Sequence, residues 1–390
     1  MIKRDIPKIR FYSYQGAWTE KRIADIVKIS AGGDVDKERL KESGKYPVIA
    51  NALTNKGIVG FYDDYKVKAP AVTVTGRGDV GYAVARHENF TPVVRLLTLQ
   101  SDNIDVDYLE NQINSMRILN ESTGVPQLTA PQLGNYKVYH PEIDEQFAIG
   151  SLFRNLDDLL ASYKDNLASY QSLKMTMLSK MFPKVGQTVP EIRLDGFECE
   201  WEVLQLSDIC QKVTEKNKDN NFNETFTNSA EFGIISQRDF FEKDISNEKS
   251  LNTYYVVRDN DFVYNPRISN YAPVGPIKRN KLGRAGVMSP LYFVFRIINS
   301  NIDLNFLETF FDTNTWHKFM KLNGDSGARA DRFAIKDSVF LTMPIAFPSL
   351  PEQQAIGSYF SNLDKLIKSH QEKISQLETL KKKLLQDMFI

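Results

Sequence analysis

The chain has 390 residues, of which 42% are apolar and 25% charged, so a disordered chain and a collagen-like fibre are excluded. Lysine plus arginine (49) balances aspartate plus glutamate (49), and this zero net charge gives no overall preference for a polyanion. Two cysteines are too few for a disulfide framework, and no apolar run approaches the ~18 residues that span a bilayer. We therefore expect a folded cytoplasmic protein of several domains without membrane contact.

The first 140 residues are predicted to form short strands and turns. Strands are expected at 46–50, 71–75, 82–85 and 92–99, with glycine, asparagine and aspartate between them. Between two of these strands, residues 76–81 spell a literal G-x-G-x-x-G. A nucleotide-binding loop of this kind would lead into a helix, whereas here a strand follows, so we interpret the segment as a glycine-rich β-turn.

Two long helices are predicted. Residues 141–145 and 351–353 fit their starts, with an early proline and acidic residues in the first turn, and neither glycine nor proline interrupts 151–182 or 358–390. Apolar residues recur there every three or four positions, a 3.5-residue period typical of coiled coils, and Lys174 and Lys381 take equivalent places in the stripe. We expect the two helices to pack antiparallel on each other; the alternative is that each packs on its own globular half. The seam is predicted to contain Ile149, Phe153, Leu156, Leu160, Leu167, Met177, Ile356, Phe360, Leu363, Ile367, Ile374, Leu377 and Leu384.

The second middle region is also predicted to be mixed. Strands are expected at 254–258, 261–265 and 291–298, followed by a helix at 305–320. Residues 262–302 contain six basic side chains and no aspartate or glutamate, with tyrosine, asparagine and serine between them. This composition favours a surface that contacts phosphates and base edges, and the alternative is a solvated basic face. Residues 65–101 of the first half are also rich in basic side chains, but they include Asp79 and Glu88, so their excess of positive charge is smaller.

The chain contains a tandem repeat with similar edges and dissimilar middles. Residues 141–183 align with 348–390 and share the motif E-Q-x-A-I-G-S-x-F-x-N-L-D. A second match relates Ile6-Pro7-Lys8-Ile9-Arg10 to Val189-Pro190-Glu191-Ile192-Arg193, with Trp18 and Trp201 following at the same distance. Similar edges indicate a shared mechanical role, and dissimilar middles indicate that each half presents different chemistry. Simple divergence after an old duplication is the alternative.

No motif in the sequence indicates catalysis. A Walker A sequence, a kinase catalytic loop, a Ser-His-Asp set and a metal-ligand spacing of the four histidines are all missing. Tyr264-Asn265-Pro266-Arg267 lacks the second proline and the aromatic residue of the amino-methyltransferase motif Asn-Pro-Pro-aromatic. We therefore expect a protein that binds rather than catalyses.

The duplicated order of these motifs resembles the specificity subunit of prokaryotic Type I restriction–modification systems, over essentially the whole chain. The resemblance implies an α+β chain with two pseudo-symmetric α/β target-recognition domains separated by two long antiparallel coiled-coil helices. The expected domains are a first recognition domain at 1–140, a central helix and linker at 141–188, a second recognition domain at 189–347, and a C-terminal helix at 348–390. The first opening is degenerate, with Phe11-Tyr12-Ser13-Tyr14 where the second has Leu194-Asp195-Gly196-Phe197.

The resemblance also implies partners and cofactors. Each recognition domain would read half of a split, asymmetric site on double-stranded DNA. The helices would dock two modification subunits, which carry S-adenosylmethionine, and through them two restriction subunits, which use ATP and Mg²⁺. This chain would hold no cofactor and no metal. Three other functions are the alternatives to this interpretation: a duplicated adaptor for a carbohydrate or protein ligand, an enzyme acting at residues 76–81, and the recognition part of a fused restriction enzyme.

Polar residues beside predicted turns and in the basic segments are the candidate DNA contacts, because arginine pairs with guanine and asparagine or glutamine with adenine. In the first domain they are Asn51, Asn55, Lys56, Thr75, Gly76, Arg77, Gly78 and Gln127. In the second domain they are Ser236, Gln237, Arg238, Tyr264, Asn265, Arg267, Ser269, Tyr271, Arg284, Arg329 and Arg332, with Lys278, Arg279 and Lys281 assigned to phosphates.

Overall fold

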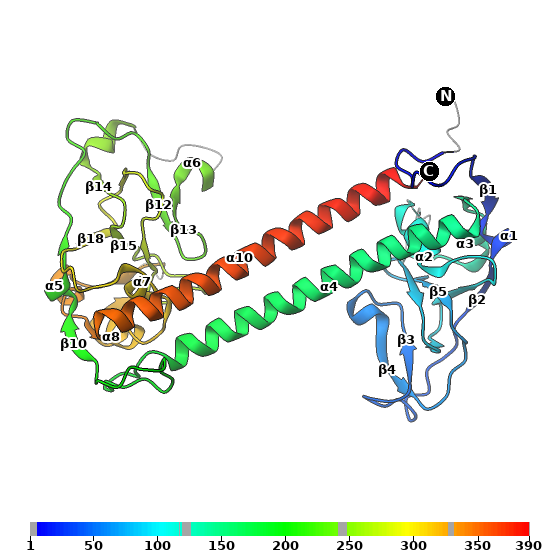
Figure 1. Ribbon diagram of the computed structural model, residues 1–390, viewed down its shortest axis with the longest axis horizontal. Coiled ribbons are helices and arrows are strands. Elements are labelled where there is room, and N and C mark those ends of the chain that lie inside the picture. Colours follow the sequence, from blue (N-terminus) through cyan, green and yellow to red (C-terminus); the bar gives the residue numbers. More distant parts are fainter. Residues whose placement is uncertain (1–5, 117, 119–125, 241–247, 327–330, 390) are drawn as a thin grey trace. The chain divides into compact units, whose positions relative to one another are not determined.

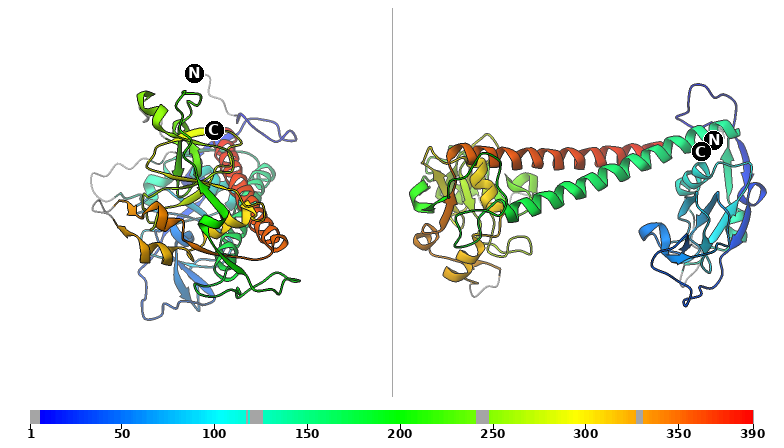
Figure 2. Two further views of the ribbon diagram at one scale, coloured as in Figure 1. Left: turned by 90° about the vertical axis from the view of Figure 1, so that its left-hand side faces the viewer. Right: turned by 60° about the horizontal axis from the view of Figure 1, so that its bottom comes forward.

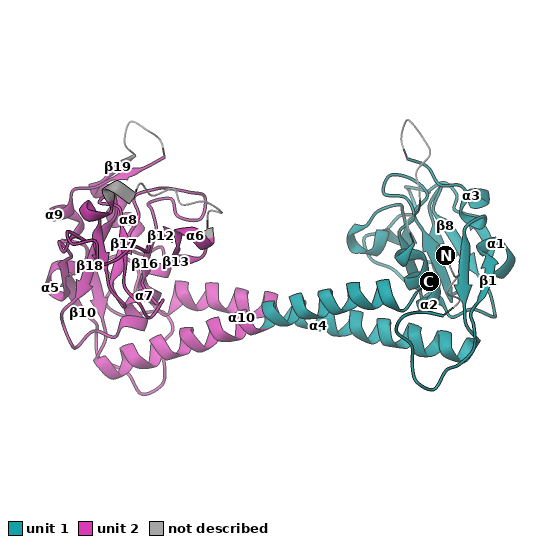
Figure 3. Cartoon of the chain, turned by 90° about the horizontal axis from the view of Figure 1, so that it is seen from above, with its two compact units in different colours: residues 1–166, 370–390 teal, residues 167–369 magenta. Residues whose placement is uncertain are grey.

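The structure, a computed structural model, describes residues 6–116, 118, 126–240, 248–326 and 331–389. It contains two compact units, coloured separately in Figure 3: unit 1 is Met1–Asn166 with His370–Ile390, and unit 2 is Leu167–Ser369. Two 38-residue helices, α4 (Ile143–Lys180) and α10 (Leu350–Asp387), each contribute one part to each unit (Figure 1).

Unit 1 is built on a four-stranded antiparallel sheet. The strand order is β2 (Lys28–Ala31), β8 (Leu97–Gln100), β5 (Ala71–Val74) and β6 (Ala83–Arg86). β5 is buried along its whole length, because it is central and both of its faces are covered. The remaining elements are β1 (Thr19–Arg22), α1 (Ile23–Ile26), β3 (Tyr46–Ile49), η1 (Thr54–Gly57), β4 (Ile58–Tyr62), β7 (Thr91–Pro92), α2 (Val106–Ser115), α3 (Ala130–Gly134) and β9 (Lys137–His140).

Unit 2 repeats this sheet with the same strand order. It runs β11 (Cys210–Lys212), β18 (Phe293–Ile297), β15 (Phe262–Tyr264) and β16 (Ile277–Arg279), again all antiparallel. A two-stranded ribbon also recurs, as β1 with β9 in unit 1 and as β10 (Glu202–Gln205) with β21 (Pro344–Phe347) in unit 2. Both copies of the predicted duplication therefore fold on one plan.

Other elements of unit 2 surround this sheet. Three further two-stranded ribbons are formed, β12 with β13, β14 with β17, and β19 with β20. The elements are α5 (Leu206–Ile209), β12 (Phe226–Ser229), β13 (Gly233–Ser236), α6 (Gln237–Phe240), η2 (Glu248–Thr253), β14 (Tyr255–Val257), β17 (Gly286–Met288), α7 (Leu304–Asp312), α8 (His317–Asn323), β19 (Asp325–Ser326), β20 (Phe333–Ala334) and α9 (Asp337–Phe340).

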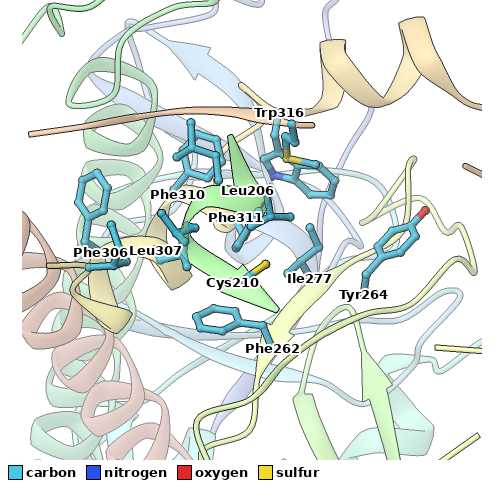
Figure 4. Packing of buried hydrophobic residues seen from close by; sticks show 14 of the residues in the cluster. Leu206, Cys210, Phe262, Tyr264, Ile277, Phe306, Leu307, Phe310, Phe311 and Trp316 are labelled. Atoms are coloured by element: carbon cyan, nitrogen blue, oxygen red, sulfur yellow. Dashed lines mark hydrogen bonds between the residues drawn. The ribbon is translucent and has the colours of Figure 1, made fainter. Parts of the chain in front are cut away.

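The core of unit 2 is rich in aromatic side chains. Phe262 of β15 stacks on Phe295 of β18 at 5.5 Å between ring centroids, and Phe306 of α7 packs on Trp201. Figure 4 labels Phe262 and Phe306 within this cluster. Unit 1 has a more aliphatic core of valine, leucine and isoleucine from β5, β8 and α2. Stacked rings gain about 0.5–1.5 kcal/mol beyond the burial of their area, so the aromatic core adds stability to unit 2.

The seam between α4 and α10 is formed within each unit, where the two helices run side by side (Figure 2). In unit 1, Leu156 and Leu160 pack on Leu377, with Ile374 and Leu384 beside them. Ile149 and Phe153 lie nearer the sheet and pack with Trp18, Tyr108, Met388 and Phe389. In unit 2, Met177 packs against the cluster that holds Ile356 and Phe360, Leu363 is buried, and Leu167 and Ile367 are half-buried. The predicted antiparallel pairing is confirmed.

Two predicted elements differ from the structure. The helix expected at 305–320 is interrupted, because the Thr313 Oγ1 donates to the Phe310 carbonyl and α7 ends there. The strand expected at 92–99 divides into β7 and β8, since Arg95 adopts a left-handed φ of 70°. Both long helices begin at or within one residue of the predicted starts, at Ile143 and Leu350, and each contains a glycine, Gly150 or Gly357, ahead of its glycine-free segment.

Candidate nucleic-acid interface

The repeated motif at each edge of the duplication ties the opening segment to a long helix through an ion pair. Arg10 and Glu145 are joined by two hydrogen bonds, Nε to Oε1 at 2.6 Å and Nη2 to Oε2 at 2.7 Å. Arg193 and Glu352 repeat this bidentate geometry, with both distances at 2.7 Å. The hydrogen bonds that the two guanidinium groups donate to these carboxylates raise the pKa of both arginines. Each unit thus holds its opening segment by the same contact.

The glutamine and glycine of the motif position a second helix. Gln146 Oε1 accepts from the Asp105 amide in unit 1, and Gln353 Oε1 accepts from the Asp303 amide in unit 2. These aspartates are the N-caps of α2 and α7. A Cβ on Gly150 would lie 2.1 Å from Asp105 Oδ1, so only glycine permits this approach. The motif therefore orients each sheet domain on its helix pair.

A lysine–aspartate pair closes the helix seam in both units. Lys381 contacts Asp157 at 2.5 Å in unit 1, and Lys174 contacts Asp364 at 2.6 Å in unit 2. In each unit the lysine of one repeat therefore pairs with the aspartate of the other. The two seam lysines noted in the sequence are ion-pair partners rather than packing residues.

The basic segment of the second domain is largely neutralised by carboxylates from elsewhere in the chain. Lys278 pairs with Asp312, Arg279 and Lys281 with Glu308, and Arg284 with Glu224. Because these carboxylates lie outside residues 262–302, the count of charges along that segment overstated its positive potential. The cationic surface predicted for these four residues therefore consists of ion pairs.

Several other candidate residues have structural roles. The Tyr264 hydroxyl donates to the Val274 carbonyl inside the core, and burial raises the pKa of this tyrosine. Asn265 is buried, and its side chain bonds the Asn228 carbonyl and the Arg267 amide. Ser236 is also buried. These side chains are thus used within unit 2.

Residues of the first domain near the β5–β6 turn are used in a similar way. Asn51 accepts from the Gly76 amide at 2.8 Å and donates to the Val94 carbonyl. Thr75 accepts from the Tyr82 amide, and both contacts shape the turn. β5 pairs with β6 as a hairpin, so the interpretation of residues 76–81 as a β-turn is confirmed. Gly78 has a left-handed φ of 77° at this turn.

The turn after β5 and the turn after β15 each form one antiparallel bridge with a distant segment. In unit 1, Arg77 lies opposite Gln127, held by Leu128 N–Gly76 O at 3.0 Å and Gly78 N–Pro126 O at 3.3 Å. In unit 2, Arg267 lies opposite Arg332, held by Phe333 N–Pro266 O at 2.8 Å and Ile268 N–Asp331 O at 3.1 Å. The structure therefore pairs four of the candidate residues, which the sequence had indicated only singly, at equivalent places of the two sheets.

The side chains of these bridges have hydrogen-bonding groups to spare. Arg77, Gln127 and Arg267 are exposed and form no side-chain hydrogen bond or ion pair with any described residue. The Arg332 Nε lies 3.9 Å from Asp331 and is otherwise unpartnered. Like charges directly opposite each other on a bridge are destabilising, so Arg267 and Arg332 are placed at a cost that an anionic ligand would offset.

The remaining candidates surround these bridges or lie elsewhere on the domains. Asn55 and Lys56 are exposed with left-handed φ, and the Lys56 carbonyl accepts from Arg86, whose pKa burial lowers to about 10. Tyr271 is 82% exposed, and it lies in a turn in which the Ser269 Oγ accepts from the Ala272 amide. Gln237 is half-buried, Arg238 is exposed, and Arg329 lies outside the described residues.

Two further absences hold for the residues that the structure describes. No group of three histidine, cysteine, aspartate or glutamate side chains is arranged to hold a metal ion. None of the described helices has both the length and the apolar character needed to cross a bilayer.

Sequence reasoning missed the buried arginine–glutamate pairs, although both partners lie in the repeated motifs. Their recurrence was a usable signal. When an arginine in one repeated segment and a glutamate in another recur together in both copies, a contact between the two segments is suggested.

Comparisons with known proteins agree with this architecture. The family model of the Type I restriction modification DNA specificity domain matches twice, at residues 15–169 and 198–379. The Type I restriction enzyme MjaVIII specificity subunit of Methanocaldococcus jannaschii is 22% identical over 401 residues, covering 94% of this chain and 91% of that protein. A putative type I specificity subunit of Mycoplasma pneumoniae is 24% identical over 159 residues, covering 40% of this chain and 43% of that protein.

The fold is shared with a solved structure. The S subunit of a Type I restriction–modification system from M. genitalium superposes with a TM-score of 0.65 at 14% sequence identity, covering 99% of both chains. The two family matches together span most of the chain and coincide with the two copies of the duplication. The chain therefore belongs to the Type I restriction–modification DNA specificity family.

Proposed function

We propose that this chain is the non-catalytic DNA-recognition subunit of a Type I restriction–modification complex, and that each unit reads one half of a two-part, asymmetric site. The observation that carries the proposal is the pair of equivalent bridges, Arg77 with Gln127 and Arg267 with Arg332. They place side-chain N–H donors that have no hydrogen-bond partner among the described residues at equivalent positions of the two domains. The lysine and arginine side chains at 278–284, in contrast, are paired with carboxylates. The two halves differ in these side chains, which favours two unlike half-sites.

The helix pair supplies the proposed docking surface for two modification subunits. Leu159 of α4 and Leu380 of α10, 43% and 45% exposed, lie in unit 1, two residues from Asp157 and next to Lys381 in the sequence. Leu366 and Leu173, 44% and 38% exposed, occupy the equivalent places in unit 2. Because the same pair of exposed leucines, one on each long helix, occurs in both units, two copies of one partner can bind by the same contacts.

The cofactors of the reaction belong to the partners in this proposal. The modification subunits would bind S-adenosylmethionine, and the restriction subunits, attached through them, would bind ATP and Mg²⁺. The role of this chain is to choose the DNA sequence and to hold the modification subunits at it.

Co-expression with the cognate modification subunit, followed by methylation-aware sequencing of host DNA, tests the recognition role. The expected result is adenine methylation within one split motif, which disappears when this chain is omitted. Methylation that is independent of this chain, or a methylated motif of a single part, would contradict the proposal.

Native mass spectrometry tests the docking surface. Leu159→Asp alone is expected to leave a complex with one modification subunit, and Leu159→Asp with Leu366→Asp a chain with none. Ala161→Asp is the control, because it adds the same charge to an exposed position of α4 whose side chain points about 200° around the helix axis from Leu159. Two bound subunits in the double variant would refute the surface.

A further inference from the structure

We infer that the bridges Arg77·Gln127 and Arg267·Arg332 are the base-reading elements of the two units, and that Gln127 against Arg332 decides which base each half-site requires. The inference rests on the proposed function and deepens it. It concerns the two side chains on each bridge, and it selects four residues from the many polar groups of the surface.

The bonding pattern of the bridges puts both side chains of a pair on one face. In each bridge the hydrogen bonds join the residues before and after the pair, so the paired residues themselves are a non-hydrogen-bonded pair. In such pairs the Cα atoms are about 4.5 Å apart and the side chains lean from the same face. A two-stranded ribbon of this width fits the major groove of B-DNA.

An asparagine side chain fixes the backbone of the turn that carries Arg77 and of the turn that carries Arg267. In unit 1 the Asn51 Oδ1 accepts from the Gly76 amide, and a Cβ on Gly76 would lie 2.2 Å from the Arg95 carbonyl oxygen. In unit 2 the Asn265 Oδ1 accepts from the Arg267 amide at 3.0 Å. The turns are therefore pre-organised, while the ends of the arginine side chains stay unpaired.

The chemistry of the side chains predicts the bases. Arginine binds guanine O6 and N7 with two hydrogen bonds, and glutamine binds adenine N6 and N7 in the same manner. Cα atoms about 4.5 Å apart are close to the ~3.4 Å spacing of successive nucleotides, so each pair addresses neighbouring base pairs. Unit 1 is thus expected to require one guanine and one adenine, and unit 2 two guanines.

The charges of the two bridges support the same assignment. Arg267 and Arg332 repel each other in the free chain, and the acceptors O6 and N7 of two neighbouring guanines would relieve that repulsion. Gln127 is neutral and leaves no such repulsion opposite Arg77. The two bridges therefore differ in the ligand that satisfies them.

Exchange of the variable residue tests the inference. The full chain carrying Gln127→Arg, assembled with its modification subunits, is used to select bound DNA from a library randomised over both half-sites. The expected result is a change from adenine to guanine at one position of one half-site, by roughly tenfold to a hundredfold, with the other half-site unchanged. Arg332→Gln is expected to produce the opposite change in the other half-site only.

Asn103→Arg is the matched control, because it adds one exposed positive charge to unit 1. Asn103 follows the C-terminal end of β8. Arg77 follows the C-terminal end of β5, which pairs with the N-terminal end of β8, so the two residues follow opposite ends of these antiparallel strands. If Gln127→Arg, like the control, only strengthens binding to all sequences, the pair contacts phosphate and the inference is overturned. If the wild-type complex selects no sequence at all, the proposed function itself has failed.

Discussion

The ion pair between Arg193 and Glu352 offers a quantitative test of how each sheet domain is held on the helix pair. The Glu352 side chain is 1% exposed and the Arg193 side chain 15%, and two hydrogen bonds of 2.7 Å join them. Glu352→Gln preserves the shape of the side chain but removes its charge. The guanidinium of Arg193, in a largely buried place, then loses the counter-charge to which it is hydrogen-bonded.

The expected loss follows from this burial. Removing one partner of a buried pair costs about 3–5 kcal/mol, and since Arg193 retains some contact with water we expect about 3 kcal/mol of unfolding free energy. For a unit of this size that corresponds to a fall of roughly 6–12 °C in the midpoint of thermal unfolding. Arg193→Met combined with Glu352→Leu is expected to recover much of the loss, because neither charge is then buried alone.

Differential scanning calorimetry of the full chain measures these midpoints. Glu191→Gln is the matched control, because it breaks the Lys180–Glu191 pair, whose side chains are 39% and 49% exposed, and it should leave the midpoint near that of the wild type. The reasoning is refuted if Glu352→Gln and Glu191→Gln shift the midpoint equally, or if the double variant is less stable than Glu352→Gln alone.

Four further substitutions have defined outcomes. Gly150→Ala should destabilise unit 1, measured by urea unfolding, because the new Cβ would overlap Asp105 at the start of α2. Burial raises the pKa of Glu110 from 4.5 to about 7, so the folded state binds this proton more tightly and the unfolding free energy should fall as pH rises from about 4.5 to 7. Glu110→Gln should remove that fall, measured as thermal midpoints across this pH range. Arg267→Ala should lose about 1–3 kcal/mol of discrimination at one base pair, whereas Lys281→Ala, whose ammonium pairs with Glu308, should barely change the salt dependence of DNA binding.

Each of these outcomes has its own check. Gly33→Ala is the control for Gly150, because its Cβ would meet only the end of Lys66 at 3.6 Å. A pH dependence that persists in Glu110→Gln would assign it to another group. A larger change in salt slope for Lys281→Ala than for Arg267→Ala would mean that the ion pair with Glu308 opens when DNA binds.

The helices and their pairing were accessible from the sequence because their signals are local and repeated. A 3.5-residue apolar period over some thirty residues can be satisfied only by packing against a second stripe, and the two copies provide it, as Leu160 on Leu377 shows. The helix starts were accessible too, because proline and acidic residues mark them in both copies, but glycine inside a helix does not act there as a boundary. At Gly150 it serves instead to admit Asp105 of α2.

The candidate interface was only partly accessible, because charge counted along a segment does not reveal the partners of that charge. Arg284 and Lys278 looked free in the sequence, yet Glu224 and Asp312, far away in the chain, neutralise them. Conversely, nothing in the local sequence relates Arg77 to Gln127, since fifty residues separate them and only the sheet brings their backbones together.

The sequence alone thus determined the duplication, the two long helices and the division into similar edges and unlike middles, because each is expressed as periodicity or identity along the chain. Tertiary structure decided which cations are spent in ion pairs and which arginines remain available, as at Arg267 opposite Arg332. The physical reason is that electrostatic and hydrogen-bonding partners are chosen by distance in space, and contacts over fifty or more residues leave no local pattern to read.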